Sequence, residues 1–160
     1  MRRALLVALG VVLAVGAVAV GVLVFGSRDD SQLAGAVEGP GQAQPEGAAP
    51  PASGAHSDAL VTRDRKTLTD DQLVNALALG DVVILYDGAR PDPALVKLQK
   101  DVAGPFDAEV AAAGQAVILA RRAGAGPATA LAWKRILRTG DPADPALREF
   151  AEFWLGRGLT

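Results

Sequence analysis

The pattern of hydrophobic and polar positions divides the chain into three parts, of which the first is a long apolar run. This run extends without a charge from Ala4 to Phe25, with Arg2 and Arg3 before it and Arg28 after it. Its length matches the ~20 residues that a helix needs to cross a hydrocarbon core of about 30 Å. We therefore predict a transmembrane helix over residues 4–25, within a first segment that comprises residues 1–26.

A cleaved secretory signal is the alternative, because Ala17-Val18-Ala19 has the small-x-small form that signal peptidase recognises. The apolar stretch continues beyond Ala19 to Phe25, so it is longer than the roughly 7–15 residues of a signal-peptide core, and we favour a retained anchor. The two N-terminal arginines outweigh the single arginine after the run, which places the N-terminus in the cytoplasm. We expect a single-pass protein of the cell membrane whose C-terminal domain is extracytoplasmic.

The second part, residues 27–66, is rich in Gly, Pro, Ala, Gln and Glu and has few bulky apolar residues. A segment of this composition cannot bury enough apolar surface to offset the loss of chain entropy on folding. We therefore predict a disordered linker over residues 27–66. His56, the only histidine of the chain, lies in this linker and is expected to be a solvated loop residue rather than a ligand.

The third part, residues 67–160, alternates between helical and strand patterns and is predicted to be one extracytoplasmic domain. Thr69 and Gln72 form a capping-box pattern at the start of a helix that ends at Gly80. The continuous apolar run over residues 82–86 that follows is typical of a strand buried on both faces. The domain therefore begins with a helix and a central strand.

Further segments complete this domain, identified by apolar positions at helical spacing, by Gly-Pro turns and by β-branched runs. They are, in order, a helix over residues 91–102, an ambiguous segment over 106–114 that we interpret as a strand rather than a helical turn, strands over 115–122 and 129–138 on either side of the turn 124–127, and a helix that begins at Asp144-Pro145. The short turn predicts that the two strands beside it form a hairpin. The order α-β-α-β-β-α predicts an α/β fold, with α+β as the alternative, in which helices cover a small mixed sheet in two or three layers.

A family resemblance is carried by Leu77 to Asp87, Leu95 and Leu98, Gly126-Pro127, Ala130 to Trp133, and Phe150 to Phe153. Together these residues resemble the bacterial and archaeal family catalogued as domain of unknown function 3105. Its members typically have a Leu-Glu-His-Gly segment before the strand, and often an N-terminal membrane anchor; here that segment is Leu77-Ala78-Leu79-Gly80. The family's Glu and His are therefore absent, and we expect its upstream Gly-Pro-His segment to be missing too. The family name implies no activity.

The reactive side chains available exclude most catalytic and metal chemistry in the domain. Between Thr67 and Thr160 there is no His, Cys or Ser, so the common nucleophile–base pairs and zinc ligands are missing. We therefore expect no metal ion and no cofactor. Asp87 and Asp92 follow the central strand and are the best-placed pair of carboxylates for hydrolysis. A turn at Asp87 and a helix start at Asp92 are the favoured interpretation.

Two aromatic residues and a group of cations are candidates for ligand binding. Tyr86 and Trp133 are expected at the sheet, where Trp133 could stack on a ligand, although packing in the core is the favoured role. Cations on both arms of the predicted hairpin could bind an anionic polymer or lipid, or could simply protect a sheet edge. They are Arg121, Arg122, Lys134, Arg135 and Arg138. Acidic residues outnumber basic ones in the domain, so we expect no nucleic acid partner.

The membrane tether and the missing catalytic groups favour a non-enzymatic envelope protein. It is expected to bind the lipid bilayer through residues 4–25 and a neighbouring membrane or envelope protein through its domain. The alternative is a domain that binds a ligand, lipid or anionic polymer through Tyr86, Asp87, Arg121, Arg122, Trp133 and Arg135. Hydrolysis by Asp87 and Asp92 is the third hypothesis.

Overall fold

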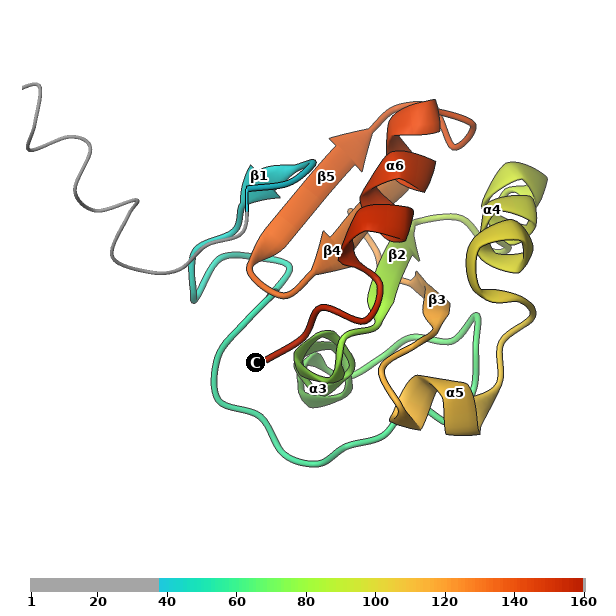
Figure 1. Ribbon diagram of the computed structural model, residues 1–160. Coiled ribbons are helices and arrows are strands. Elements are labelled where there is room, and N and C mark those ends of the chain that lie inside the picture. Colours follow the sequence, from blue (N-terminus) through green and yellow to red (C-terminus); the bar gives the residue numbers. More distant parts are fainter. Residues whose placement is uncertain (1–37, 160) are drawn as a thin grey trace, which may run out of the picture. The chain divides into compact units, whose positions relative to one another are not determined.

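The computed structural model describes residues 38–159 of the chain, so the predicted transmembrane helix over residues 4–25 lies outside the described part. Within residues 38–159 there are five strands and four helices (Figure 1). They are, in order, β1 (Gln42–Ala43), α3 (Asp70–Leu79), β2 (Val82–Tyr86), α4 (Pro93–Ala103), α5 (Ala108–Ala112), β3 (Val117–Arg121), β4 (Ala128–Ala132), β5 (Arg135–Thr139) and α6 (Pro145–Trp154). None of the helices in this range is long and apolar enough to cross a membrane.

The strands form one mixed sheet in the order β1-β5-β4-β2-β3. β2 lies inside the sheet, parallel to β3 and antiparallel to β4, and Val83 pairs with Ile118 on one side and with Leu131 on the other. All five residues of β2 are buried, which confirms the predicted buried strand. The mixed α/β fold expected from the sequence is therefore correct.

The predicted pairing of the strands on either side of the turn 124–127 is wrong. β3 and β4 do not pair with each other, because β2 lies between them. The loop between them crosses the end of β2, where Arg122 N–H donates to the Tyr86 carbonyl and Asp87 N–H donates to the Gly126 carbonyl. The hairpin is instead formed by β4 and β5, whose tight turn contains Trp133 and Lys134, with Lys134 at a φ of 58°.

The segment 106–114 forms the short helix α5 and not the predicted strand. Asp107 is its N-cap, since the side chain accepts hydrogen bonds from the backbone N–H groups of Glu109 and Val110. An aspartate that satisfies free N–H groups in this way favours a helix start over a strand. The other helices agree with the sequence: Thr69 and Gln72 form the capping box of α3, and Asp144 caps α6.

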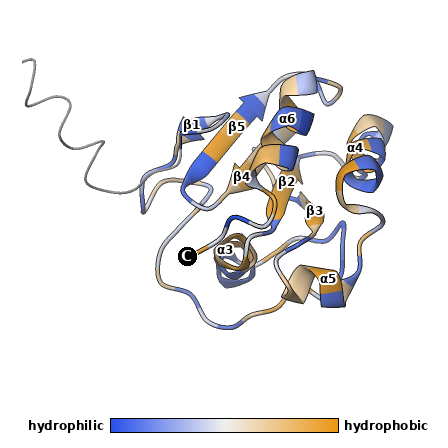
Figure 2. Cartoon of the chain, in the orientation of Figure 1, coloured by the Kyte–Doolittle hydropathy of each residue, from blue (hydrophilic) through white to orange (hydrophobic). Residues whose placement is uncertain are grey.

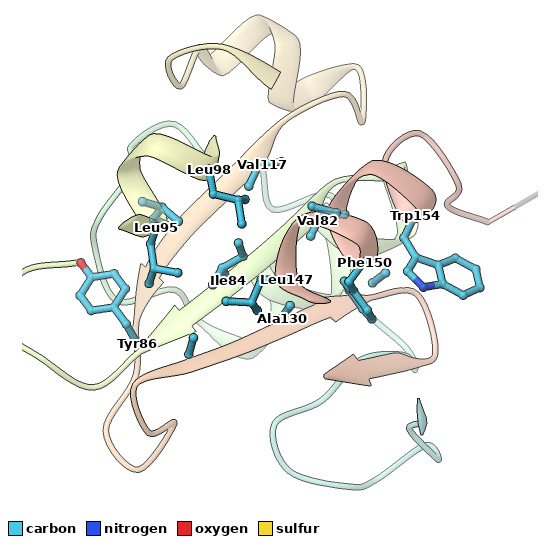
Figure 3. Close-up of a cluster of buried hydrophobic side chains, with 14 residues drawn as sticks. Val82, Ile84, Tyr86, Leu95, Leu98, Val117, Ala130, Leu147, Phe150 and Trp154 are labelled. Atoms are coloured by element: carbon cyan, nitrogen blue, oxygen red, sulfur yellow. The ribbon is translucent and has the colours of Figure 1, made fainter. Parts of the chain in front are cut away.

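Alternate residues of β2 belong to two separate hydrophobic cores on the two faces of the sheet. Val82, Ile84 and Tyr86 pack under α4 and α6, and Figure 3 shows Leu147 and Phe150 of α6 over the middle of this cluster. Val83 and Leu85 belong to the second core, together with residues of α3 and α5. Hydrophobic colours follow the inner strands in Figure 2. Helices therefore cover both faces of the sheet.

The predicted disordered linker is wrong over residues 39–66, which we call the arm. The arm belongs to the same compact unit as the rest of the domain. Its residues Ala52 and Val61 are buried in the second core, and β1 pairs with β5. Backbone hydrogen bonds join the arm to the hairpin turn, between Gln44 N–H and the Lys134 carbonyl and between Lys134 N–H and the Ala52 carbonyl. The arm has few bulky apolar side chains, and it is held in the domain by small buried residues and by backbone hydrogen bonds.

The end of the arm runs along β3 and covers its outer edge. Arg65 N–H donates to the Leu119 carbonyl, and Arg121 N–H donates to the Lys66 carbonyl. Asp64 accepts hydrogen bonds from Leu119 N–H at 2.8 Å and from the Gln99 side chain of α4 at 2.9 Å. An uncovered strand edge exposes unpaired backbone groups that invite association with other chains. The arm therefore completes the sheet as well as the second core.

Candidate functional site

The structure places the predicted site residues at opposite ends of the sheet. Tyr86 and Arg121 end the parallel strands β2 and β3, with Asp87 and Arg122 just beyond them. Trp133 and Arg135 lie at the far end, because β4 runs antiparallel to β2 and Val83 pairs with Leu131. At about 3.3 Å per residue, the length of β2 separates the two groups by roughly 15 Å. The six residues therefore do not form one site.

At the first end, the side chain of Tyr86 lies in the core with its hydroxyl near charged groups. The residue is 3% exposed, and Figure 3 shows it at the opposite end of the cluster from Trp154. Burial raises the pKa of Tyr86 above its usual 10.0, and the nearby Asp64 carboxylate adds to this, whereas Arg65 and Arg121 act in the opposite direction. Burial disfavours the phenolate. Tyr86 is therefore a neutral hydroxyl at physiological pH.

The cations at this end are accompanied by carboxylates. Arg122 forms a salt bridge of 2.9 Å with Asp70 in the first turn of α3. Asp64 lies 3.4 Å from the guanidinium of Arg65. A surface salt bridge such as Arg122–Asp70 contributes little to stability, but both pairs reduce the positive field that an anionic polymer would meet. This end of the sheet is mixed in charge rather than basic.

The two carboxylates proposed for hydrolysis serve as backbone caps. An oxygen of Asp87 accepts a hydrogen bond from Gly124 N–H at 3.1 Å and so holds the loop after β3. Asp92 accepts from Ala94 N–H at 2.8 Å as the N-cap of α4, with Pro93 at the first helical position. Asp and Pro at these two positions are typical of a helix start. The favoured turn and helix-start interpretation is thus what the structure shows.

At the second end, Trp133 contacts His56, which was expected to be a solvated loop residue. Their ring centroids are 6.1 Å apart with the planes at 67°, an edge-to-face contact. Nδ1 of His56 donates to the Gly54 carbonyl at 2.9 Å, which orients the ring. Both residues are partly exposed. No local signal in the sequence predicts this contact, because it joins residues far apart in the chain.

The arm beside this aromatic pair contains a buried polar group. The Ser53 hydroxyl has no hydrogen-bond partner among residues 38–159. A neighbouring side chain, Gln44, donates to the Pro50 carbonyl at 2.9 Å and fixes the proline turn. We call the surface formed by His56, Trp133 and Lys134 the hairpin-tip surface. It combines an aromatic platform, an imidazole and an exposed cation on a backbone that hydrogen bonds hold in place.

The remaining cations lie apart from one another. The guanidinium of Arg135 is 5.2 Å from the ring centroid of Trp154, on the face covered by α6. Arg138 donates to the Ala49 carbonyl of the arm at 3.1 Å. The five cations of the predicted hairpin are therefore divided between both ends of the sheet. No group of three His, Cys, Asp or Glu residues within the described range is placed to hold a metal ion.

These features define a class of protein: a small mixed α/β domain with helices on both faces of its sheet and an N-terminal arm built into it. The sequence profile of the family described as "Protein of unknown function (DUF3105)" matches residues 46–158, and the chain belongs to this family. No curated protein and no solved structure matches the chain.

The family match confirms the resemblance seen in the sequence and extends it into the arm. Because it begins at residue 46, the matched range includes His56 of the arm. His56 is the same residue that contacts Trp133. The hairpin-tip surface is thus part of the family domain.

Proposed function

We propose that the protein is a single-pass, membrane-anchored module of the cell envelope that binds a neighbouring membrane or envelope protein without catalysis, and that the hairpin-tip surface is its contact site. The observation that carries the proposal is the pairing of His56 with Trp133, two partly exposed rings from distant parts of the chain. The predicted anchor over residues 4–25 and the extracytoplasmic location of the domain are parts of the same proposal.

The hairpin-tip surface has the composition and the rigidity that protein interfaces use. Tryptophan is enriched among the residues that dominate binding energy, since one side chain buries a large area and keeps a polar N–H. Backbone hydrogen bonds from Lys134 and Gln44 hold the hairpin turn against the arm. A surface that is already ordered loses little conformational entropy when a partner binds.

The other two hypotheses receive less support. Binding of an anionic polymer needs cations on one surface, whereas those of this domain are divided between two ends of the sheet and are accompanied by carboxylates at one of them. Asp87 and Asp92 each accept a backbone hydrogen bond that gives the residue a structural role, Asp87 in the loop after β3 and Asp92 at the start of α4. Protein binding through the hairpin-tip surface depends neither on clustered cations nor on these carboxylates.

The test is capture of the full-length protein from its own membranes at native abundance, through a C-terminal tag after brief cross-linking, with mass spectrometry of the co-purifying proteins. We expect a stoichiometric membrane or envelope partner. Replacement of a central tryptophan typically costs at least about 2 kcal/mol, so Trp133→Ala should weaken capture by more than ~10-fold.

The matched control is Phe106→Ala, which removes another partly buried aromatic ring packed against the same core. It should leave partner capture unchanged while destabilising the domain to a similar extent. Absence of any stoichiometric partner would reject the proposed function. Equal capture by Trp133→Ala and Phe106→Ala would reject the hairpin-tip surface as the contact site.

A further inference from the structure

Two exposed leucines lie together at the end of the domain where α3 finishes. Leu79 is 40% exposed and Leu159 is 59% exposed. The residues 155–159 after α6, which we call the tail, bring them together, because Leu159 N–H donates to the Ala78 carbonyl at 2.7 Å. Figure 1 shows the C-terminal end of the chain beside α3. Isolated apolar residues are common on protein surfaces, whereas exposed apolar residues that lie next to one another indicate an interaction site.

Backbone contacts hold this pair rigidly. Gly156 N–H donates to the Gly80 carbonyl at 2.8 Å, so the tail packs directly against the end of α3. A side chain at Gly158 would collide with the carbonyl oxygen of Ala78. The chain therefore comes close enough for main-chain hydrogen bonds only because glycine is present, and the leucines extend from a fixed surface.

The arm starts at the same end of the domain. Gly39 lies against the rings of Phe153 and Trp154, and the indole N–H of Trp154 donates to the Pro40 carbonyl at 2.8 Å. Trp154 directly precedes the tail. Only residues 26–38 separate Gly39 from the end of the predicted transmembrane helix.

Cations accompany the leucines. Arg157 is exposed, and its guanidinium lies 4.3 Å from the ring centroid of Phe153. Lys134 is exposed at the same end of the sheet. The carboxylates nearest in the chain are Asp81, which is buried and accepts a hydrogen bond from Ala116 N–H, and Glu152, which is paired with Arg148 at 3.3 Å. Apolar side chains flanked by basic ones are the combination that binds an anionic bilayer surface.

We propose that the surface formed by Leu79, Arg157 and Leu159 docks on the anionic lipid bilayer and orients the domain on the membrane. This inference rests on the membrane anchor of the proposed function. A short tether to a membrane anchor raises the effective concentration of a weak lipid contact, so a small docking surface suffices. Docking leaves the other end of the sheet, with Tyr86 and Asp87, pointing away from the membrane.

The chain has no cysteine, so single cysteines can be introduced and labelled with an environment-sensitive fluorophore. We would place them in the full-length protein as Leu79→Cys, Leu159→Cys and, as a control at the opposite end of the sheet, Arg90→Cys. The protein is reconstituted in vesicles of phosphatidylcholine and phosphatidylglycerol that carry a lipid-attached quencher. We expect quenching at positions 79 and 159 to be several-fold greater than at position 90. Equal quenching at all three positions would overturn the proposal.

A pair of acidic substitutions gives a second test that keeps the anchor intact. Leu79→Glu combined with Arg157→Glu should reduce quenching at position 159 to the level of position 90. The matched control is Leu60→Glu, which changes a leucine that is 47% exposed near the start of α3. It should leave quenching at position 159 unchanged, and a loss of quenching in the control alone would contradict the assignment.

Alkaline extraction of the native membranes separates the two proposals. Release of the full-length protein would reject the anchor, and with it the proposed function. Retention of the protein together with equal quenching at the three labelled positions would reject only the docking of the domain. Quenching that is the same in vesicles of phosphatidylcholine alone would reject the role of Arg157 and anionic lipid.

Discussion

Asp81 is the residue whose ionisation the fold changes most. It is 1% exposed, and one of its oxygens accepts a hydrogen bond from Ala116 N–H at 2.8 Å. Burial raises the pKa of Asp81 from 3.8 to about 7, against the opposing effect of that hydrogen bond. The folded protein therefore holds a proton on this carboxyl between about pH 4 and pH 7, where the unfolded chain does not. The charged form is the one that the fold disfavours.

The free energy of unfolding should accordingly fall as pH rises from 4 to 7, since the native state binds more protons than the unfolded state in that range. A shift of this size corresponds to at most about 4 kcal/mol, and we expect about 1–3 kcal/mol after relaxation. Asp81→Asn removes the titration and should be the more stable protein at pH 8. Urea unfolding at pH 5 and pH 8 measures the difference. Asp87→Asn, which alters an exposed cap, is the control, and an unchanged pH dependence in Asp81→Asn would contradict the prediction.

At the scale of elements, the end of α3 is a junction of three segments joined by backbone. α3 ends at Gly80 in the left-handed conformation, and the turn after α5 packs against it. Gly114, at a φ of +70°, lies so close that an added side chain would collide with the carbonyl oxygen of Leu79. The tail is hydrogen-bonded to Gly80 as well, through Gly156 N–H. The junction therefore tolerates no side chain where these segments meet.

Gly114→Ala should destabilise the protein much more than Gly124→Ala. Both glycines have a similar positive φ, of +70° and +77°, but Gly124 has open space around it. Gly124→Ala should cost about 1 kcal/mol for the left-handed backbone, and Gly114→Ala should cost about 2–3 kcal/mol more for the collision. Chemical denaturation of the two variants measures this. Equal losses of stability would show that the contact at Gly114 relaxes without cost.

At the scale of the whole molecule, the arm joins parts of the fold that would otherwise be exposed. It fills part of the second core, covers the edge of β3 and holds the hairpin turn. Asp64 is the central contact, because its two oxygens accept hydrogen bonds from Leu119 of β3 and Gln99 of α4. Gln99 is itself buried and also donates to the Val117 carbonyl at 2.8 Å. The arm is therefore as much a part of the domain as its sheet.

Asp64→Ala should lower the free energy of unfolding by about 2–3 kcal/mol, because it leaves a partly buried N–H group without its acceptor. The amide of Leu119 should exchange its hydrogen faster, and so should that of Arg121, whose acceptor is Lys66. Hydrogen exchange and urea unfolding test the two effects together. Asp58→Ala, at an exposed position of the same arm, should change neither. Normal protection of Leu119 in Asp64→Ala would show that the arm does not stabilise this edge.

Local sequence determined the elements whose signals lie within a few residues of one another. The capping box at Thr69, the proline step after Asp144 and the apolar run of β2 each act through contacts inside one element, so they could be predicted without the rest of the fold. The long apolar run at the N-terminus likewise predicts its helix from its own length, although that segment lies outside the described residues. The segment 106–114 was wrongly predicted as a strand, because its strand pattern is weak and the N-cap Asp107 favours a helix start.

Only the tertiary structure decided which strands pair, whether the arm folds and which candidate residues share a surface. β3 pairs with β2 and not with the next strand, β4, because this pairing gives β2 a parallel neighbour and buries it inside the sheet. The turn between β3 and β4 carries no local signal of that pairing. The arm folds because the domain supplies the apolar and hydrogen-bonding partners that its own composition lacks. His56 meets Trp133, and Tyr86 is separated from it, through contacts between residues far apart in the chain. Such contacts form only where the whole fold repays the entropy of closing long loops.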